Sequence, residues 1–225
     1  MVLAVYSGWE QSKNRRFLEF LSHDPSAIVV DLGCGNAGFS VQARERIGCK
    51  EMWGVDSDER LLNEAEQKGV KVRKADLNLR LPFDDGFFDV VLSSQLIEHL
   101  FYPVKFMKEV HRILRPNGYA VISTENLASW DNLIALFLGN TPFSMEFDSG
   151  LRKVGNPLSP HEKESKPDYI NTHVRVFAWN GLVELARLLE FRIETVCGNG
   201  HVLGRLGETL DAKHSRFITL RLRKR

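Results

Sequence analysis

Three aspartates follow short apolar runs in the first part of the sequence, each at a point where a strand is expected to end. Asp31 follows the run AIVV, Asp56 follows MWGV, and Asp76 follows VKVRKA. Open α/β sheets bind ligands outside the carboxyl ends of their parallel strands, so these carboxylates are expected along one rim of a sheet. Any one of them alone is equally well explained as a helix cap or a turn former. Together they predict a rim that attracts a positively charged ligand.

A glycine-rich turn directly follows the first of these aspartates. Gly33, Gly35 and Gly38 have the spacing G-x-G-x-x-G between the expected strand and the start of a helical pattern. Glycines in such a turn let backbone N–H groups approach a ligand closely. The spacing matches the dinucleotide fingerprint, and Asp56 lies near the distance expected of its ribose-binding acid. An NAD(P)-dependent oxidoreductase is therefore one interpretation.

A carboxylate at Asp31 argues for a different ligand, because it would repel the pyrophosphate of NAD. S-adenosylmethionine carries an ammonium and a sulfonium, which a carboxylate attracts. Its ribose hydroxyls can donate hydrogen bonds to Asp56, and its adenine amine can donate one to Asp76. The residues of the rim therefore favour this methyl donor.

Four stretches carry a family resemblance: VVDLGCGNAGFS, GVDSDERLL, KADLNLRLPFDDGFFDVVLSSQLIEHL and RILRPNGYAVISTEN. In this order they resemble the motifs of class I S-adenosylmethionine-dependent methyltransferases, in the small-molecule, ubiquinone-biosynthesis-like subgroup (methyltransferase type 11). The resemblance covers roughly residues 28–126. It implies a Rossmann-like, doubly wound α/β sheet of seven strands with an antiparallel C-terminal strand pair. It also implies S-adenosylmethionine as the cofactor and S-adenosylhomocysteine as the product.

The resemblance further implies which residues touch the cofactor. Gly33 and Gly35 would surround the methionine moiety, while Asp56 would bind the ribose and Asp76 would lie beside the adenine. The full set of expected cofactor-binding residues is Asp31, Gly33, Cys34, Gly35, Asp56, Ser57, Asp76, Leu77 and Ser93.

The acceptor is expected at the end of the fourth strand, where the sequence reads SSQLIEH. This segment lacks the Asn/Asp-Pro-Pro-aromatic signature of enzymes that methylate exocyclic base amines, which disfavours base-flipping DNA methylation. Glu98-His99 instead resembles small-molecule O- and C-methyltransferases. His99 is the candidate catalytic residue: it is a general base, a residue that only orients the acceptor, or a structural residue. Methyl transfer is an in-line displacement that needs alignment more than a base, so all three interpretations stay open.

The same segment bears on metal binding. Some related methyltransferases bind a divalent metal through Glu-x-x-Glu-His. Gln95 stands here in place of the first Glu, which removes a charge that a hard cation prefers. We therefore expect no metal, and Gln95 becomes a candidate contact to the acceptor.

Hydrophobic periodicity predicts the elements that position these residues. The expected helices cover 12–22, 38–47, 58–68, 103–114, 127–138 and 180–189. The expected strands cover 27–30, 52–55, 70–75, 87–93, 119–124, 191–196 and 217–222. Alternation of βαβ units in this order indicates a parallel sheet with right-handed crossovers.

The chain divides into four expected segments: an N-terminal helical cap (1–26), the cofactor-binding core (27–124), a substrate lid (125–171) and the rest of the core (172–225). The lid segment holds four of the eight prolines and follows the fifth strand, so it would lie over the ligand rim. A surface excursion whose aromatic residues only pack locally is the alternative.

The substrate-binding candidates outside the core motifs come from the lid segment and the stretch after it. Trp130 and Phe143 are expected as apolar contacts. His173 and Arg175 would share a face of the extended stretch HVRVF and bind an anionic group of the substrate. An exposed strand face is the alternative for this last pair.

Composition limits the classes of function. The 225 residues carry a net charge of +1, which argues against a dedicated nucleic-acid binder, and no apolar run is long enough to cross a bilayer. Three cysteines without a CxxC pair indicate neither a disulfide framework nor a zinc site, so a cytoplasmic location is expected. The oligomeric state does not follow. The sequence predicts a methyltransferase that acts on a small molecule at oxygen; the alternatives are the oxidoreductase and a non-catalytic cofactor-binding subunit.

Overall fold

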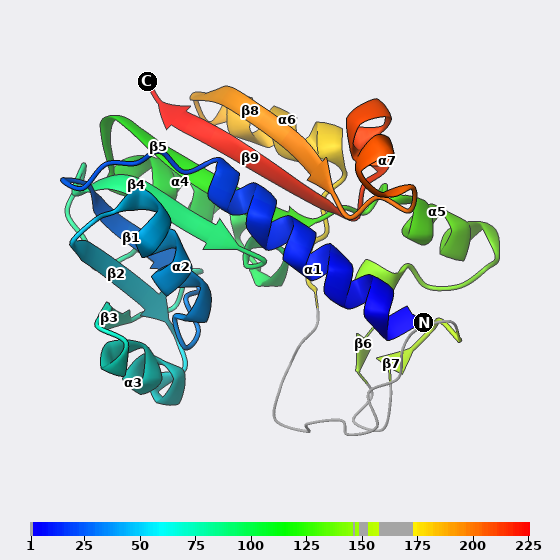
Figure 1. Ribbon diagram of the computed structural model, residues 1–225, viewed down its shortest axis with the longest axis horizontal. Helices are drawn as coiled ribbons and strands as arrows, with labels where there is room; N and C mark the ends of the chain where they lie inside the picture. The colour runs from blue at the N-terminus through cyan, green and yellow to red at the C-terminus, as the bar shows by residue number, and fades with distance from the viewer. Residues whose placement is uncertain (1, 146, 149–152, 158–172) are drawn as a thin grey trace.

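A computed structural model describes residues 2–145, 147–148, 153–157 and 173–225 (Figure 1). Its centre is a seven-stranded sheet in the order β3-β2-β1-β4-β5-β9-β8. The strands are β1 (Ile28–Leu32), β2 (Glu51–Asp56), β3 (Lys71–Lys74), β4 (Phe88–Ser94), β5 (Leu114–Glu125), β8 (Phe191–Asn199) and β9 (Phe217–Lys224). Strands β1 to β5 pair in parallel, and β9 pairs antiparallel with both β5 and β8. This topology confirms the predicted sheet and its antiparallel end.

Helices cover both faces of the sheet. They are α1 (Val2–Glu19), α2 (Gly38–Ile47), α3 (Glu59–Gln67), α4 (Pro103–Ile113), α5 (Trp130–Phe137), α6 (Trp179–Leu188) and α7 (Gly204–Leu210). Figure 1 shows α1 and α2 on one face of the sheet, with α4 and α6 on the other. Successive side chains of a strand point to opposite faces. Accordingly, Val29 packs in a core cluster with Phe17 of α1, whereas Val30 packs in a second cluster with Phe106 of α4.

Most element boundaries lie within a few residues of those predicted, and the larger differences are at the starts of α1 and β5. Helix α1 begins at Val2, ten residues before the predicted start at residue 12. Strand β5 begins at Leu114, which pairs with Phe88 before the register shifts to the pair of Val90 with Tyr119. Residues 115–118, which lie between the predicted helix and the predicted strand, are therefore part of a bulged strand. Helix α7 was not predicted.

The stretch HVRVF is not a strand, which corrects the prediction for residues 173–177. Its Phe177 makes only an isolated bridge, with Asn126. The backbone N–H groups of Val174 and Arg175 both donate to the carbonyl oxygen of Glu98, at 2.7 and 3.1 Å. The backbone bends here because both N–H groups bond the same carbonyl oxygen. The side chains of residues 173–177 therefore do not alternate between two faces as they would in a strand.

The segment predicted as a lid contains little regular structure in its described part. It comprises α5, the 3-10 turn η2 (Phe143–Met145), and a small antiparallel pair of β6 (Phe147–Asp148) and β7 (Lys153–Val154). Pro160 and Pro167 lie outside the described residues. The lid, like the four segment boundaries, stays a prediction. Among the described residues, no helix is both long enough and apolar enough to cross a membrane.

Glu194 of β8 is a point at which pH should change stability. Its carboxylate accepts hydrogen bonds from Arg223 and Arg221 of β9, and these bonds lower its pKa to about 2 from the ordinary value of 4.5. The stabilisation is therefore complete above the unfolded pKa and is lost as the pH falls toward 2. We expect Glu194→Gln to lower the free energy of unfolding by about 1 kcal/mol at pH 7.

Urea denaturation at several pH values measures this effect. The difference between Glu194→Gln and the wild type should shrink as the pH is lowered from 5 to 3. Glu184→Gln, on the exposed side of α6, should leave stability within about 0.5 kcal/mol at every pH. A difference for Glu194→Gln that stays constant with pH would contradict the role of the ion pairs.

Candidate active site

The turn after β1 is built from left-handed backbone conformations. Gly33 and Gly35 have φ values of 80° and 51°. The N–H groups of Gly33 and Cys34 both donate to the carbonyl oxygen of Val55, at 2.8 and 3.1 Å, which ties the turn to the end of β2. A Cβ atom added at Gly35 would meet no atom within 4 Å. A ligand can therefore approach the backbone of Gly35 from the side on which any other residue would carry its Cβ atom.

Asp31 lies beneath this turn, not on an open rim. The residue is 3% exposed, and the hydroxyl of Ser40 on α2 donates to its Oδ2 at 2.6 Å. Burial raises the pKa of Asp31 from 3.8 to about 7. The sequence does not predict the contact of Ser40 with Asp31, because nothing in the pattern GFS shows which helix residue faces the strand. Asp31 can thus change its charge near neutral pH.

The other two aspartates differ from Asp31 and from each other. The half-buried carboxylate of Asp56 accepts hydrogen bonds from the N–H groups of Gly35 (2.9 Å) and Asp58 (3.0 Å), which places it beside the glycine turn. Asp76 is exposed, and its Oδ1 accepts from the N–H and the side-chain amide of Asn78. Those contacts match the turn role that was the alternative for Asp76. Its proposed contact to adenine stays a prediction.

The remaining expected cofactor contacts show a mixture of environments. Cys34 is buried, and a Cβ on Gly54 would lie 2.7 Å from its Sγ, so the thiol fills the space that Gly54 leaves. Burial raises the pKa of this thiol. Ser57 is exposed, whereas Leu77 and Ser93 are buried. The Oγ of Ser93 has no hydrogen-bond partner within the described part of the chain.

The segment that follows β4, where the acceptor is expected, contacts the glycine turn through Leu96. Gln95 has a φ of 54°, uncommon for a residue with a side chain, and this conformation turns the chain into the 3-10 turn η1 (Ile97–His99). Its side-chain amide donates to the hydroxyl of Ser123 at 3.4 Å. The side chain of Leu96 packs on Gly33, where a Cβ would lie 3.0 Å from it. The residues of η1 therefore come directly after Leu96, which contacts the glycine turn.

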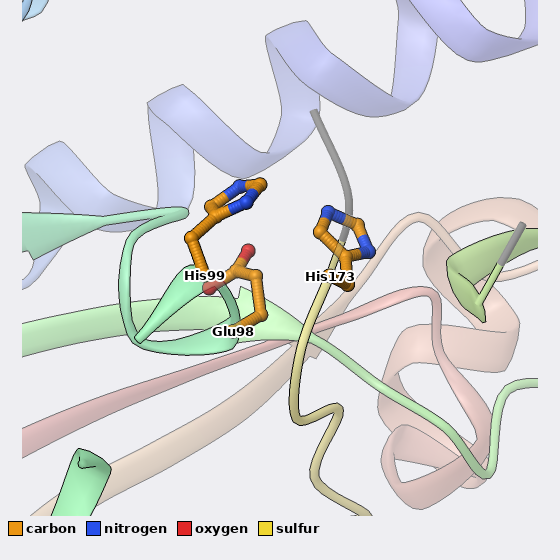
Figure 2. A group of neighbouring side chains, drawn as sticks. All are labelled: Glu98, His99 and His173. Atoms are coloured by element: carbon orange, nitrogen blue, oxygen red, sulfur yellow. The ribbon is translucent and has the colours of Figure 1, made fainter. Parts of the chain in front are cut away.

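Glu98, His99 and His173 form a polar cluster next to this contact (Figure 2). One donor atom from each lies within 4.8 Å of the others, and the two imidazole ring centroids are 4.8 Å apart. Glu98 is fully buried and accepts a 2.8 Å hydrogen bond from the hydroxyl of Thr124. Burial raises the pKa of Glu98 to about 7, while the charge of Lys13 on α1 acts in the opposite direction. Glu98 was noted in the sequence only as the neighbour of His99.

The side chains of two predicted substrate contacts have neighbours outside this cluster. The indole N–H of Trp130 donates to the carboxylate of Asp211 at 2.7 Å, and its ring packs on His214 near α7. Arg175 is exposed and lines a different hollow of about 440 Å³ with Phe101. The strand that would place Arg175 on one face with His173 is absent, and a role for Arg175 in binding stays a prediction.

Phe143 lies closer to the cluster. It is half-buried in η2, next to Ser144, whose carbonyl oxygen is 2.6 Å from Nδ1 of His173. Ser144 is held in turn by Asn132 of α5, whose amide group bonds both its hydroxyl and its N–H. The described part of the lid segment thus reaches His173 through the carbonyl of Ser144.

The fold and the site are typical of a Rossmann-like methyltransferase: the sheet has the expected strand order, and acidic residues lie beside an open glycine turn. Residues 30–122 match the family model described as a methyltransferase domain. An uncharacterized methyltransferase of Mycobacterium sp. (strain KMS) is 31% identical over 192 residues, which cover 77% of this chain and 73% of that protein. The chain belongs to the class I S-adenosylmethionine-dependent methyltransferases.

Two further similarities agree with this family. A probable S-adenosylmethionine-dependent methyltransferase of Mycolicibacterium smegmatis is 29% identical over 84% of this chain and 61% of its own length. The crystal structure of an S-adenosylmethionine-dependent methyltransferase from Mesorhizobium loti superposes with a TM-score of 0.63 at 22% identity, covering 93% of this chain and 96% of that one. The similarity to the Mesorhizobium loti structure shows that this chain has the same fold.

The cofactor is S-adenosylmethionine, and the residues present suit it. Gly35 offers an open backbone, and Asp56 lies 2.9 Å from the N–H of that residue. The buried Asp31 offers a carboxylate to a cation and would repel a phosphate. These features do not favour the NAD(P)-dependent oxidoreductase.

The raised pKa of Asp31 makes a testable link between cofactor affinity and pH. We expect ionised Asp31 to attract the ammonium of the cofactor, so affinity for S-adenosylhomocysteine should rise severalfold as the pH increases from 6 to 8. In Asp31→Asn the affinity should be lower and independent of pH in this range. Titration calorimetry at pH 6, 7 and 8 measures both.

Asp31 should affect stability in the opposite direction: a rise in pH that increases cofactor affinity should lower the free energy of unfolding. Because the folded pKa lies above the unfolded value, the wild type should lose stability relative to Asp31→Asn as the pH rises from about 4 to about 7. Asp84→Asn, in an exposed loop, serves as the matched control. A pH-independent affinity in the wild type would contradict the role given to Asp31.

Proposed function

We propose that this methyltransferase transfers the methyl group to an oxygen atom of a small-molecule acceptor, which lies against His99. The observation that carries the proposal is the contact of Leu96 with Gly33. Because Leu96 directly precedes η1, this contact supports a position of His99 near the turn that we expect to receive the cofactor. A polar cluster in this position suits an acceptor hydroxyl.

The surroundings of the cluster support a small acceptor. Glu98 is fully buried, and His99 and His173 are each half-buried. The carbonyl of Ser144, in the segment predicted as a lid, and the backbone of residues 174–175 lie against the cluster. A polymer would need an open surface here, and the net charge of +1 offers no general attraction for nucleic acid.

The proposed step needs an acceptor for the hydroxyl proton. Bound S-adenosylmethionine supplies a methyl group on a sulfonium, whose sulfur keeps the C–S electron pair and becomes the thioether of S-adenosylhomocysteine. As the C–O bond forms, the neutral imidazole of His99 can accept the hydroxyl proton. Glu98, next to it, favours the resulting positive charge. We place the reaction in the cytoplasm, whose reducing conditions suit the free thiols of Cys34, Cys49 and Cys197.

His99→Ala tests the proposal. Turnover on a hydroxyl acceptor should fall roughly tenfold or more, because the group that orients and deprotonates the acceptor is removed. The affinity for S-adenosylhomocysteine should stay within about twofold. Transfer of a radiolabelled methyl group to panels of phenols, aliphatic alcohols and amines measures turnover, with His111→Ala on α4 as the control.

Three outcomes would contradict the proposal. Preferential labelling of amines would exclude oxygen as the acceptor atom. Undiminished turnover in His99→Ala would leave His99 with a structural role. Cofactor binding without labelling of any acceptor would favour the non-catalytic subunit.

A further inference from the structure

The polar cluster also has the geometry of a ligand set. Glu98 and His99 come from η1, and His173 comes from the segment that precedes α6. Figure 2 shows the Glu98 carboxylate beside the gap between the two imidazole rings. The donor atoms of all three lie within 4.8 Å of one another. Two distant parts of the sequence thus direct two nitrogen donors and one oxygen donor at the same point.

Glu98 supplies an independent observation that points to a ligand. Its Oε2 accepts the hydrogen bond from Thr124, but its Oε1 has no hydrogen-bond partner among the residues that the structure describes. Both oxygens belong to a fully buried side chain. A buried carboxylate is costly unless it meets a cation or enough donors. Thr124 meanwhile fixes the orientation of the carboxylate within the cluster.

The hydrogen bond of His173 is the one expected of a metal ligand. A carbonyl oxygen only accepts hydrogen bonds, so Nδ1 of His173 donates to Ser144. The neutral ring then has its lone pair on Nε2. A histidine that ligates a metal commonly donates its other nitrogen to a carbonyl or carboxylate, which fixes its tautomer and orientation.

The backbone holds the two parts of the cluster together. The carbonyl oxygen of Glu98 accepts hydrogen bonds from the N–H groups of both Val174 and Arg175. These bonds hold Val174, the residue after His173, against the backbone of Glu98. The distance between the two ligand-bearing segments is therefore set by the main chain and does not depend on flexible side chains alone.

We propose that Glu98, His99 and His173 bind a divalent transition-metal ion such as Zn²⁺, Mn²⁺, Fe²⁺ or Co²⁺. Two imidazoles and a carboxylate are the protein ligands of catalytic zinc sites and of non-haem iron sites, which keep further positions open. Mg²⁺ and Ca²⁺ prefer oxygen ligands and suit this set less well. Bonds of about 2.1 Å separate the donors of a tetrahedral ion by roughly 3.4 Å, so small side-chain rotations would close the site.

This proposal replaces the expectation of no metal. That expectation rested on Gln95, which lacks the charge of a glutamate. In the structure Gln95 donates to Ser123, and His173 provides the third donor. A nitrogen donor changes the preferred ion from a hard cation to a transition metal.

The inference rests on the proposed function for the role of the ion. A cation here would hold the acceptor oxygen and lower the pKa of its hydroxyl, so that the proton passes to water. His99 would then act as a ligand instead of a base. The binding of the ion itself does not depend on that role and can be measured separately.

Cobalt binding to the full-length protein tests the site. After treatment with a chelator, the wild type should bind one Co²⁺ per chain and develop visible d–d absorption, which Zn²⁺ displaces. His173→Ala and Glu98→Gln should each weaken Co²⁺ binding at least tenfold, while His23→Ala, an exposed histidine elsewhere, should not. Thr124→Val should weaken binding roughly tenfold, because it releases the carboxylate of Glu98 without removing a ligand. Thermal unfolding checks that each variant is folded.

The outcomes separate this inference from the proposed function. Failure to bind Co²⁺, or equal binding by His173→Ala and the wild type, would overturn the metal site, and Lys13 would remain the cation that acts on Glu98. Methylation of hydroxyl acceptors by such a protein would leave the proposed function standing. Stoichiometric binding that the variants lose, without methylation of any hydroxyl acceptor, would instead overturn the proposed function and keep the site.

Discussion

Replacing Asp56 by alanine should reduce the affinity for S-adenosylhomocysteine by roughly 150-fold, or about 3 kcal/mol. The proposed reason is the loss of both hydrogen bonds from the ribose hydroxyls to a charged acceptor. The carboxylate lies at the end of β2 and already faces the N–H of Gly35 at 2.9 Å. Titration calorimetry against the wild type at pH 7.5 measures the effect.

The control must separate lost binding from lost stability, because Asp56 also accepts hydrogen bonds within the protein. Asp58→Ala serves this purpose. Asp58 caps the start of α3 through the N–H groups of Arg60 and Leu61, so its removal should cost about 1 kcal/mol of stability. It should leave cofactor affinity within about twofold. Equal affinities for Asp56→Ala and the wild type would exclude Asp56 as the ribose ligand.

A methyl group at Gly35 should have an effect of similar size. The Cβ of Gly35→Ala meets no protein atom within 4 Å, so the protein itself offers no clash. It would stand in the space through which the cofactor approaches the backbone. Overpacking of this kind costs about 1–3 kcal/mol. We therefore expect a loss of up to roughly 100-fold in affinity for S-adenosylhomocysteine.

Gly204→Ala is the matched control for the backbone. Gly204 has a φ of 61°, close to the 51° of Gly35, and a Cβ there also meets nothing within 4 Å. Both variants should lose about 1 kcal/mol of stability, because alanine is disfavoured at positive φ. Only Gly35→Ala should lose cofactor affinity. Unchanged binding in Gly35→Ala would show that the cofactor does not approach this turn.

Local patterns were sufficient to predict the fold around the glycine turn, where we expect the cofactor. The run AIVV, the three glycines and Asp56 are close in sequence, and their positions follow from the geometry of one βαβ unit. The order of the strands followed from the same alternation. Boundaries were less exact where tertiary pairing extended an element, as in β5 and β8.

The acceptor half of the site depends on contacts that no local pattern contains. His173 reaches Glu98 because two backbone N–H groups after it share the carbonyl of Glu98, and because Ser144 holds its ring. A strand pattern over residues 173–177 predicted a different direction for Arg175. In the same way, the sequence placed Asp31 and Asp76 in one row, whereas the fold buries the first and exposes the second.

A crystal structure with S-adenosylhomocysteine is the most direct test of how the turn and its acidic neighbours hold the methyl donor. We expect both ribose hydroxyls within hydrogen-bond distance of Asp56, the amino group on the side of Asp31, and the sulfur facing the segment that carries His99. A cofactor bound elsewhere, with Asp56 still bonded only to the N–H groups of Gly35 and Asp58, would contradict this arrangement.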